Sequence, residues 1–470
     1  MYERHQRSSN IVAKQQGIQL PFKTSSDKQK EAAKAWIDPA VTDIVYGGAK
    51  GGGKSYLGAA LIFGSALMYP GTRYFIARKQ LNDLRKHTIP TIDKVFEDWG
   101  IEQKRYLKFN GQDNTYHLNN GSTVLLIEAK YWPRDPMYER FGSMTMTQGW
   151  IEEAGEFEHS AMTNLSISIG RWMNDKYNLT GKLLQTCNPK KNYLYKEYYL
   201  PWRTGTLSPE KKFIQAFAHE NTKNEAGYVH RLQAKLKGVD RERLLEGIWE
   251  YAEDADALIV YDKIIDCFTN DFVPGGDKRI TSDIARLGGD RIVRIDWDGW
   301  RGKITEQPKG KLNETAAYIE AGRHKLGCGK SDVLIDSDGM GVGINDFVGY
   351  QVFQNGSSPL PDPLQPKDIY GKPVKEEYEN LKSQCYFRLS EIINKNGLYL
   401  ECESEEQKQL IIEELQQVRI KKLDSDGKKG VIPKDKVKEA LGRSPDFADT
   451  IMMRVFFDLK PVIKFNDAEY

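Results

Sequence analysis

A glycine-rich segment between an apolar stretch and an apolar helix constrains this chain more than any other feature. Residues Gly48 to Ser55 match the pattern G-x-x-x-x-G-K-[S/T] at every fixed position. Residues 43–46 before it predict a short strand, and residues 56–69 after it predict a buried helix. Strand, loop and helix in this order are the setting in which the pattern binds phosphate. The alternative, a glycine-rich loop that arose by chance, is disfavoured by these flanks.

The chemistry of this loop would come mainly from its backbone. Glycines let the N–H groups turn inward around a phosphate, and the helix N-terminus adds a partial positive charge. Lys54 would reach the β- and γ-phosphates of a nucleotide, and Ser55 would hold Mg²⁺. The expected nucleotide contacts are Gly48, Ala49, Lys50, Gly51, Gly52, Gly53, Lys54 and Ser55.

A pair of carboxylates ends another predicted strand, in the run Trp150-Ile151-Glu152-Glu153. Glu152 is expected to position Mg²⁺, and Glu153 to orient and activate the attacking water. Paired carboxylates after a strand are common, so this pair gains its weight from the phosphate loop upstream. Glu152 stands where such enzymes usually carry an aspartate.

Asn188 follows the next predicted strand and could sense the γ-phosphate, although an ordinary strand exit through Asn188-Pro189 explains it equally well. Hydrolysis also needs a positive charge near the γ-phosphate. The candidates for this charge, each of which could instead be a solvated surface charge, are Lys50, Arg78 and Arg140.

Aspartates in the C-terminal part lie at the ends of predicted strands or open a predicted helix. Asp283 and Asp336 close two strands, and Asp446 and Asp449 precede or open the helix over 450–457. Oxygen ligands suit Mg²⁺ or Mn²⁺, and two such ions can hold the attacking and leaving oxygens of a phosphodiester. Each aspartate alone is better explained as a cap or turn, but as a set they predict a two-metal site.

Basic residues gather before the last aspartates and could hold a nucleic-acid backbone without reading its sequence. A solvated hairpin face is the alternative, since Asp424, Asp426, Asp435 and Glu439 interrupt them. The net charge of +2 gives no global positive field. The basic residues are Arg419, Lys421, Lys422, Lys428, Lys429, Lys434, Lys436, Lys438 and Arg443.

The length of 470 residues predicts two domains, or one of unusual size. Five scattered cysteines without a C-x-x-C pair are typical of a reducing compartment without structural zinc. No signal peptide or membrane-spanning segment is expected. The predicted division is a flexible arm over 1–26, a P-loop core over 27–218, a helical lid or linker over 219–270, a second domain over 271–460 and a tail over 461–470.

Apolar runs that alternate with helical stretches predict an α/β first domain with a mostly parallel sheet. Its expected strands are residues 44–46, 74–77, 123–128, 149–152 and 183–187, after a helix over 28–36, and the residues around 219–250 are expected to be helical. A mixed sheet is expected in the second domain. Its expected strands are residues 279–284, 292–297, 303–306, 315–321 and 333–336, with a long helix over 374–395.

In this order, the motifs resemble those of the large terminase subunit of tailed bacteriophages, from about residue 20 to residue 460. The similar segments are 47–55 and the strand ending at Glu152 and Glu153 (Walker motifs), 186–189 (coupling motif), 244–249 (the end of the ATPase domain) and 441–449 (the final nuclease motif). The resemblance implies an N-terminal ATPase joined to a C-terminal nuclease of the ribonuclease H type.

The resemblance also implies roles for single residues. In the ATPase, Glu153 would be the hydrolytic base, Arg140 an arginine finger toward a neighbouring subunit and Gln29 the contact to adenine. Lys50 stands where the family often has an arginine. In the nuclease, the implied metal ligands are Asp283, Asp336 and Asp446, with Asp449 as a substitute ligand or a group behind them.

The implied function is a motor subunit that hydrolyses ATP to move double-stranded DNA into the procapsid and cuts concatemeric DNA. Its implied cofactors are ATP with Mg²⁺, and two Mg²⁺ or Mn²⁺ ions in the nuclease. The implied partners are double-stranded DNA, the portal protein, the small terminase subunit and further copies of the chain in a ring on the portal, with a monomer in solution and no membrane. The implied location is the host cell cytoplasm during virion assembly.

Two other readings fit parts of the sequence. A helicase-nuclease would share the phosphate loop, but the residues after Asn270 show aspartates at strand ends in place of a second motor domain. An assembly protein that uses the nucleotide only as a switch would not need both Glu152 and Glu153.

Overall fold

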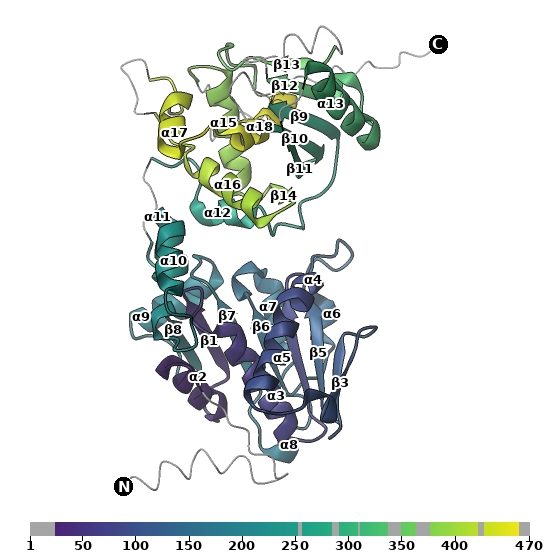
Figure 1. Ribbon diagram of the computed structural model, residues 1–470, viewed down its shortest axis with the longest axis vertical. Helices are drawn as coiled ribbons and strands as arrows, with labels where there is room; N and C mark the ends of the chain where they lie inside the picture. Colours follow the sequence, from purple (N-terminus) through teal and green to yellow (C-terminus); the bar gives the residue numbers. More distant parts are fainter. Residues whose placement is uncertain are drawn as a thin grey trace, which may run out of the picture. The chain divides into compact units, whose positions relative to one another are not determined.

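The structure is a computed structural model. It describes residues 24–251, 256–283, 291–308, 311–336, 349–362, 377–421 and 427–459. The chain divides into two compact units, Met1–Ala252 and Glu253–Tyr470, each built around its own sheet (Figure 1). This division falls before the boundary near residue 270 that the sequence suggests, and the finer partition into core and lid stays a prediction. The expected tail and most of the expected arm lie outside the described residues.

Unit 1 contains an eight-stranded sheet in the order β3-β4-β5-β2-β6-β7-β1-β8. All neighbours from β5 to β8 pair in parallel, while β3–β4 and β4–β5 are antiparallel. The predicted mostly parallel sheet is confirmed, and β3, β4 and β8 are additional strands. The strands are β1 Asp43–Gly48, β2 Arg73–Arg78, β3 Leu107–Asn110, β4 Thr115–Leu118, β5 Thr123–Glu128, β6 Gln148–Glu152, β7 Leu183–Cys187 and β8 Lys211–Ala216.

Helices cover both faces of this sheet, and a hydrophobic core lies on each face. The central helix α3 is buried along nearly its whole length, because it packs under the sheet. The expected helical stretch over 219–250 is only partly helical, in α10, α11 and the π-helical turn Arg241–Leu245. The helices are α2 Asp27–Ile37, α3 Lys54–Met68, α4 Leu81–Asp83, α5 Ile89–Asp98, α6 Glu139–Gly142, α7 His159–Ile167, α8 Asn174–Tyr177, α9 Leu200–Arg203, α10 Tyr228–Lys235 and α11 Gly238–Asp240.

Unit 2 contains a six-stranded mixed sheet in the order β13-β12-β9-β10-β11-β14. β9, β10 and β11 form an antiparallel meander, and β12 joins β9 in parallel. The mixed sheet expected for this unit is confirmed, and its ribonuclease H-like class stays a prediction. The strands are β9 Lys278–Asp283, β10 Arg291–Asp298, β11 Arg301–Pro308, β12 Val333–Asp336, β13 Gln351–Phe353 and β14 Tyr399–Glu401.

One predicted strand of unit 2 is wrong, because residues 315–321 lie within helix α13, Leu312–Leu326. The Lys311 N–H donates to Glu314 Oε2 at 2.8 Å at its start, and Gly327 ends it in the left-handed conformation (φ 72°). No helix in the described ranges is long and apolar enough to cross a membrane. The other helices are α12 Tyr261–Asp266, α15 Leu381–Asn394, α16 Glu405–Gln416, α17 Lys434–Leu441, α18 Asp446–Met453 and α19 Phe456–Leu459.

Candidate active sites

The predicted phosphate loop connects the end of β1 directly to the start of α3. Gly53 takes the left-handed conformation (φ 74°) at the N-cap of α3. A Cβ atom on Gly48 would lie 2.0 Å from the carbonyl oxygen of Ala216 on β8. Glycine is therefore required at both positions, at Gly48 by a close backbone approach and at Gly53 by the turn.

The side chain of Lys54 is already folded into the loop. Its Nζ donates hydrogen bonds to the carbonyl oxygens of Gly48 (3.2 Å) and Ala49 (2.6 Å) and to Asn188 Oδ1 (2.9 Å). Burial lowers the pKa of Lys54, and the nearby carboxylate of Glu153 opposes this shift. The Lys54 side chain is thus held against the loop by its own backbone and by Asn188.

Asn188 and Glu153 lie at the ends of neighbouring parallel strands, β7 and β6. The Asn188 Nδ2 donates to Glu153 Oε2 at 3.2 Å, so one amide contacts both Lys54 and Glu153. The backbone of Glu153 has the left-handed conformation, with φ of 52°. The structure thus brings together three of the predicted ATPase residues at one edge of the sheet.

Glu152 is buried (3% exposed) and contacts Arg78 on β2 and Thr88, the residue just before α5. The hydroxyl of Thr88 donates a short hydrogen bond to Glu152 Oε2, and Arg78 Nη1 lies 3.6 Å from the same oxygen. Thr88 closes the π-helical turn Leu84–Thr88, a geometry that is frequent at functional sites. The sequence does not reveal Thr88, because 64 positions separate it from Glu152.

Gln29 lies under the loop. Its Nε2 donates to the carbonyl oxygen of Gly53 at 3.0 Å, its Oε1 accepts from the Ser25 N–H at 2.7 Å, and the residue is 1% exposed. In this conformation Gln29 supports the turn into α3, and its contact to adenine stays a prediction. Of the remaining loop residues, Lys50 is exposed and Ser55 is partly exposed.

Arg140 lies in the segment between β5 and β6. Its Nη1 pairs with Asp135 Oδ2 at 2.6 Å, its Nη2 donates to the Lys130 carbonyl oxygen at 2.5 Å, and its guanidinium lies 4.2 Å from the centre of the Trp132 ring. These contacts hold the guanidinium within its own segment. Its role as a finger toward another subunit stays a prediction.

The segment that resembles the end of the family's ATPase domain packs against the loop. The Lys50 N–H donates to the carbonyl oxygen of Leu244 at 2.7 Å. Trp249 is fully buried and stacks on Tyr199, with ring centres 5.4 Å apart. A Cβ atom on Gly47 would lie 2.6 Å from Trp249. The loop is thus packed on this segment just before unit 1 ends.

In unit 2, Asp283 and Asp336 lie at the carboxyl ends of the adjacent parallel strands β9 and β12 and are buried. Helix α18 begins with Asp446, and the Thr281 hydroxyl on β9 donates to the Thr450 carbonyl oxygen at 2.9 Å. The pKa of Asp283 is raised well above its usual value, mainly by burial and then by the neighbouring aspartates. These carboxyl groups therefore lie near one another, and their role as metal ligands stays a prediction.

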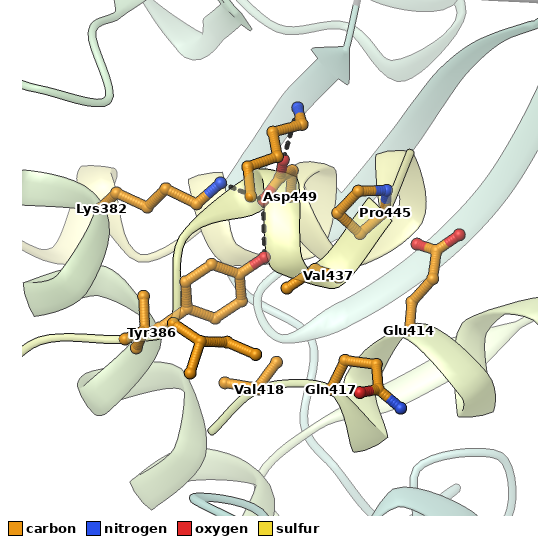
Figure 2. Close-up of a pocket in the computed structure, with 11 residues that line it drawn as sticks. Lys382, Tyr386, Glu414, Gln417, Val418, Val437, Pro445 and Asp449 are labelled. Atoms are coloured by element: carbon orange, nitrogen blue, oxygen red, sulfur yellow. Dashed lines mark hydrogen bonds and ion pairs between the residues drawn. The ribbon is translucent and has the colours of Figure 1, made fainter. Parts of the chain in front are cut away.

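Asp449 differs from the other aspartates because its negative charge is already paired with two lysines. Its carboxylate pairs with Lys382 at 2.8 Å and Lys434 at 2.7 Å, and it accepts a hydrogen bond from the Tyr386 hydroxyl at 2.6 Å (Figure 2). Burial alone would raise the pKa of Asp449, but the two lysines bring it below its usual range. Lys382 and Tyr386 come from α15 and were not found from the sequence.

Within the described ranges, no three histidine, cysteine or acidic side chains form a ready-made metal site. The segments that follow Asp283 and Asp336, residues 284–290 and 337–348, lie outside these ranges, together with the predicted turn at Asp338. The donor set still suits a hard divalent cation, because it is all oxygen and its buried carboxylates repel one another. Asp283, Asp336 and Asp446 fit such an ion better than Asp449, whose charge is paired.

Some of the predicted basic residues form ion pairs within unit 2. Lys434 pairs with Asp449, Lys421 with Glu379, and Arg443 with Glu414. The exposed members are Lys428, Lys436 and Lys438, while Lys422 lies outside the described residues.

The fold and these sites define a unit with a P-loop at the edge of a mostly parallel sheet, joined to a unit with a mixed sheet and an aspartate cluster. The family model of the phage terminase large subunit matches residues 40–235, which is most of unit 1. The predicted resemblance to phage large terminases is confirmed by this match. A comparison with curated proteins found no match.

Several solved structures are similar to this chain. The large terminase of a thermophilic bacteriophage in complex with ADP shares 14% identity, with a TM-score of 0.44, over 91% of this chain and 98% of that one. The HK97 bacteriophage large terminase shares 9% identity, with a TM-score of 0.39, over 96% and 98%. The nuclease domain of the large terminase subunit gp2 of bacterial virus Sf6 shares 20% identity, with a TM-score of 0.36, over 42% and 97%.

Proposed function

We propose that this chain is a phage DNA-packaging protein that hydrolyses ATP in unit 1 and cuts DNA in unit 2. The observation that carries the proposal is the contact of Asn188 with both Lys54 and Glu153, in a region that matches the terminase family. A loop lysine, a carboxylate base and a polar side chain between them are the groups that γ-phosphate hydrolysis requires.

In unit 1, the loop N–H groups and Lys54 would bind the β- and γ-phosphates, with Ser55 and Glu152 holding Mg²⁺. Glu153 would accept a proton from the attacking water. Since Lys54 is bonded to loop carbonyls and to Asn188, an arriving phosphate has to exchange with these bonds. When the bond from Lys54 to Asn188 breaks, the Asn188 amide could move, and its hydrogen bond to Glu153 would change with it.

In unit 2, Asp283, Asp336 and Asp446 would hold Mg²⁺ or Mn²⁺. Such ions would stabilise the charges that develop on the phosphodiester oxygens. The lysine pair keeps Asp449 charged and fixed behind the other three carboxylates. The exposed Lys428, Lys436 and Lys438 would contact the DNA backbone without reading its sequence.

The same proposal includes partners and location. Double-stranded DNA would be the substrate of both units, and the portal protein and a small terminase subunit would dock the chain during assembly. A ring of copies would form on the portal in the host cytoplasm, where Arg140 could act on a neighbouring subunit once its contact to Asp135 opens.

The test is cleavage of supercoiled plasmid with Mg²⁺ or Mn²⁺, with and without EDTA, alongside ATP turnover. The unmodified chain is compared with Asp336→Asn and Lys54→Ala, each shown to be folded by circular dichroism. We expect cutting that needs metal and Asp336 but not Lys54, and turnover that needs Lys54 but not Asp336. No cutting by folded protein under any condition would refute the nuclease, and ATP binding without turnover, with DNA present, would refute the motor.

A further inference from the structure

Helix α18, which carries Asp446 and Asp449, begins without a cap of its own. Its N-cap residue is Pro445, which has no side chain able to accept a hydrogen bond from the first turn. The free N–H of Ala448 instead donates to Glu414 Oε2 at 2.9 Å. Glu414 belongs to α16, so a separate helix supplies the missing cap.

The second carboxylate oxygen of Glu414 is held by Arg443. Glu414 is 1% exposed, and its Oε1 pairs with Arg443 Nη1, just before Pro445 in the chain. Arg443 also donates to the Leu410 carbonyl oxygen at 3.2 Å, which fixes the guanidinium on α16. The buried carboxylate thus joins both sides of the turn that leads into α18.

A buried ion pair is not a convincing source of stability, since desolvation of both charges offsets their attraction. What this pair does supply is a fixed position for the first turn of α18. The Thr281 hydroxyl fixes the next turn on β9, the strand that ends at Asp283. Asp446, the first residue of α18, is therefore followed by two anchored residues, Ala448 on Glu414 of α16 and Thr450 on Thr281 of β9.

We propose that Glu414 is a positioning residue for the carboxylate cluster and that, through the Ala448 N–H and Arg443, it sets where Asp446 meets Asp283 and Asp336. This inference rests on the proposed nuclease function. Groups that orient metal ligands in this way typically change metal affinity by about 10- to 100-fold when they are altered.

The test uses the full-length chain and Mn²⁺ itself, measured by calorimetric titration without DNA, with plasmid cleavage and thermal unfolding in parallel. Glu414→Gln keeps the shape of the side chain, but it cannot serve both Ala448 and Arg443 as an acceptor. Glu413→Gln is the matched control, since Glu413 also contacts Arg443 (3.2 Å) but, within the described contacts, not α18. Arg443→Lys is a second variant, which keeps the charge and removes the planar guanidinium.

We expect Glu414→Gln to weaken Mn²⁺ binding about 10-fold or more and to lower cleavage at limiting Mn²⁺, with partial recovery in excess Mn²⁺. Arg443→Lys should change affinity in the same direction, and Glu413→Gln should match the unmodified chain. Mn²⁺ binding that is lost in Asp446→Asn but unchanged in Glu414→Gln and Arg443→Lys would overturn this inference alone. A folded, unmodified chain that binds no Mn²⁺ would overturn the nuclease proposal and this inference with it.

Discussion

The Nζ atom of Lys54, the first residue of α3, lies 2.9 Å from the Oδ1 atom of Asn188, which directly follows β7. The other half of the Asn188 amide donates to Glu153. This geometry makes Asn188 the direct link between the loop lysine and the proposed base, and the first prediction follows from it.

We expect Asn188→Asp to lower the ATP turnover number by about 100-fold, because a second carboxylate beside Glu153 disturbs the general base. Nucleotide binding should change far less, since the loop N–H groups are unaffected. Steady-state turnover and titration with a fluorescent ATP analogue separate these effects. Asn192→Asp is the control, because Asn192 contacts Gly155 and Leu194 instead. Equal turnover in the two variants would show that Asn188 has no part in hydrolysis.

Thr88→Val should destabilise unit 1 and raise the Mg²⁺ concentration needed for half-maximal turnover. The change leaves the buried Glu152 without its hydroxyl donor, and a buried acceptor without a partner costs about 1–3 kcal/mol. Urea unfolding and a Mg²⁺ titration of turnover measure the two effects. Thr88→Ser keeps the hydroxyl and should resemble the unmodified chain, so a loss of similar size in Thr88→Ser would assign the effect to packing.

Gly47→Ala should destabilise the chain by about 1–3 kcal/mol, as expected for an overpacked core. The added Cβ would lie 2.6 Å from Trp249 and 3.1 Å from Cys187 Sγ. Trp249→Phe removes the crowded part of the ring, so the double variant should recover part of the loss in a double-mutant cycle. Gly111→Ala, at an exposed position with only distant neighbours, serves as the control. Strictly additive effects would contradict a direct contact.

Asp449→Asn should lower the free energy of unfolding by about 3–5 kcal/mol in the absence of metal, since it leaves Lys382 and Lys434 facing a neutral group. Chemical unfolding in EDTA measures this loss. The double variant with Lys434→Met removes one of the excess charges and should be more stable than Asp449→Asn alone. A double variant that is less stable would contradict charge imbalance as the cause.

A pH dependence is expected from Lys182, whose ammonium group donates to the carbonyl oxygens of Asp38 and Val41. Burial lowers the pKa of Lys182 to about 8. Below pH 8 both the folded and the unfolded chain hold the proton, and folding bears the full cost of burying the charge. As the pH rises through 8 the folded chain releases its proton first, so stability rises until the unfolded lysine also titrates at about pH 10.4.

The difference in free energy of unfolding between the unmodified chain and Lys182→Met isolates this effect. It should shift in favour of the unmodified chain between pH 8 and pH 10. A difference that stays constant over this range would show that the pKa of Lys182 is not lowered.

The sequence predicted the elements whose own residues indicate them, through an apolar run or a cluster of glycines. β5, β7 and β12 begin and end where the apolar runs do, and the loop between β1 and α3 follows from its glycines. Strand 315–321 was wrong because a short continuous apolar run such as Ala316–Ile319 fits a helix as well as a strand, and the signals at Glu314 and Gly327 indicate the helix.

Contacts between distant segments could not be predicted in this way. The partners of Asp449, Lys382 and Tyr386, come from a helix more than sixty positions earlier, and only the packing of α15 on α18 brings them there. Gln29 shows the same limit, since the family resemblance implies a contact to adenine, which stays a prediction, but could not reveal its hydrogen bond to the Gly53 carbonyl oxygen. The residue types at strand ends indicate which reaction a site could perform. The residues that contact and position them become known only from the tertiary fold.

At Glu153, the stability of the fold and the proposed role in hydrolysis favour different residues, because its backbone is left-handed. Glycine and asparagine adopt φ near 52° more readily than glutamate does, but neither can take a proton from water. A random library of this chain selected only for heat resistance should therefore enrich Glu153→Gly or Glu153→Asn, and each such survivor would be a better-folded protein with an inert ATP site.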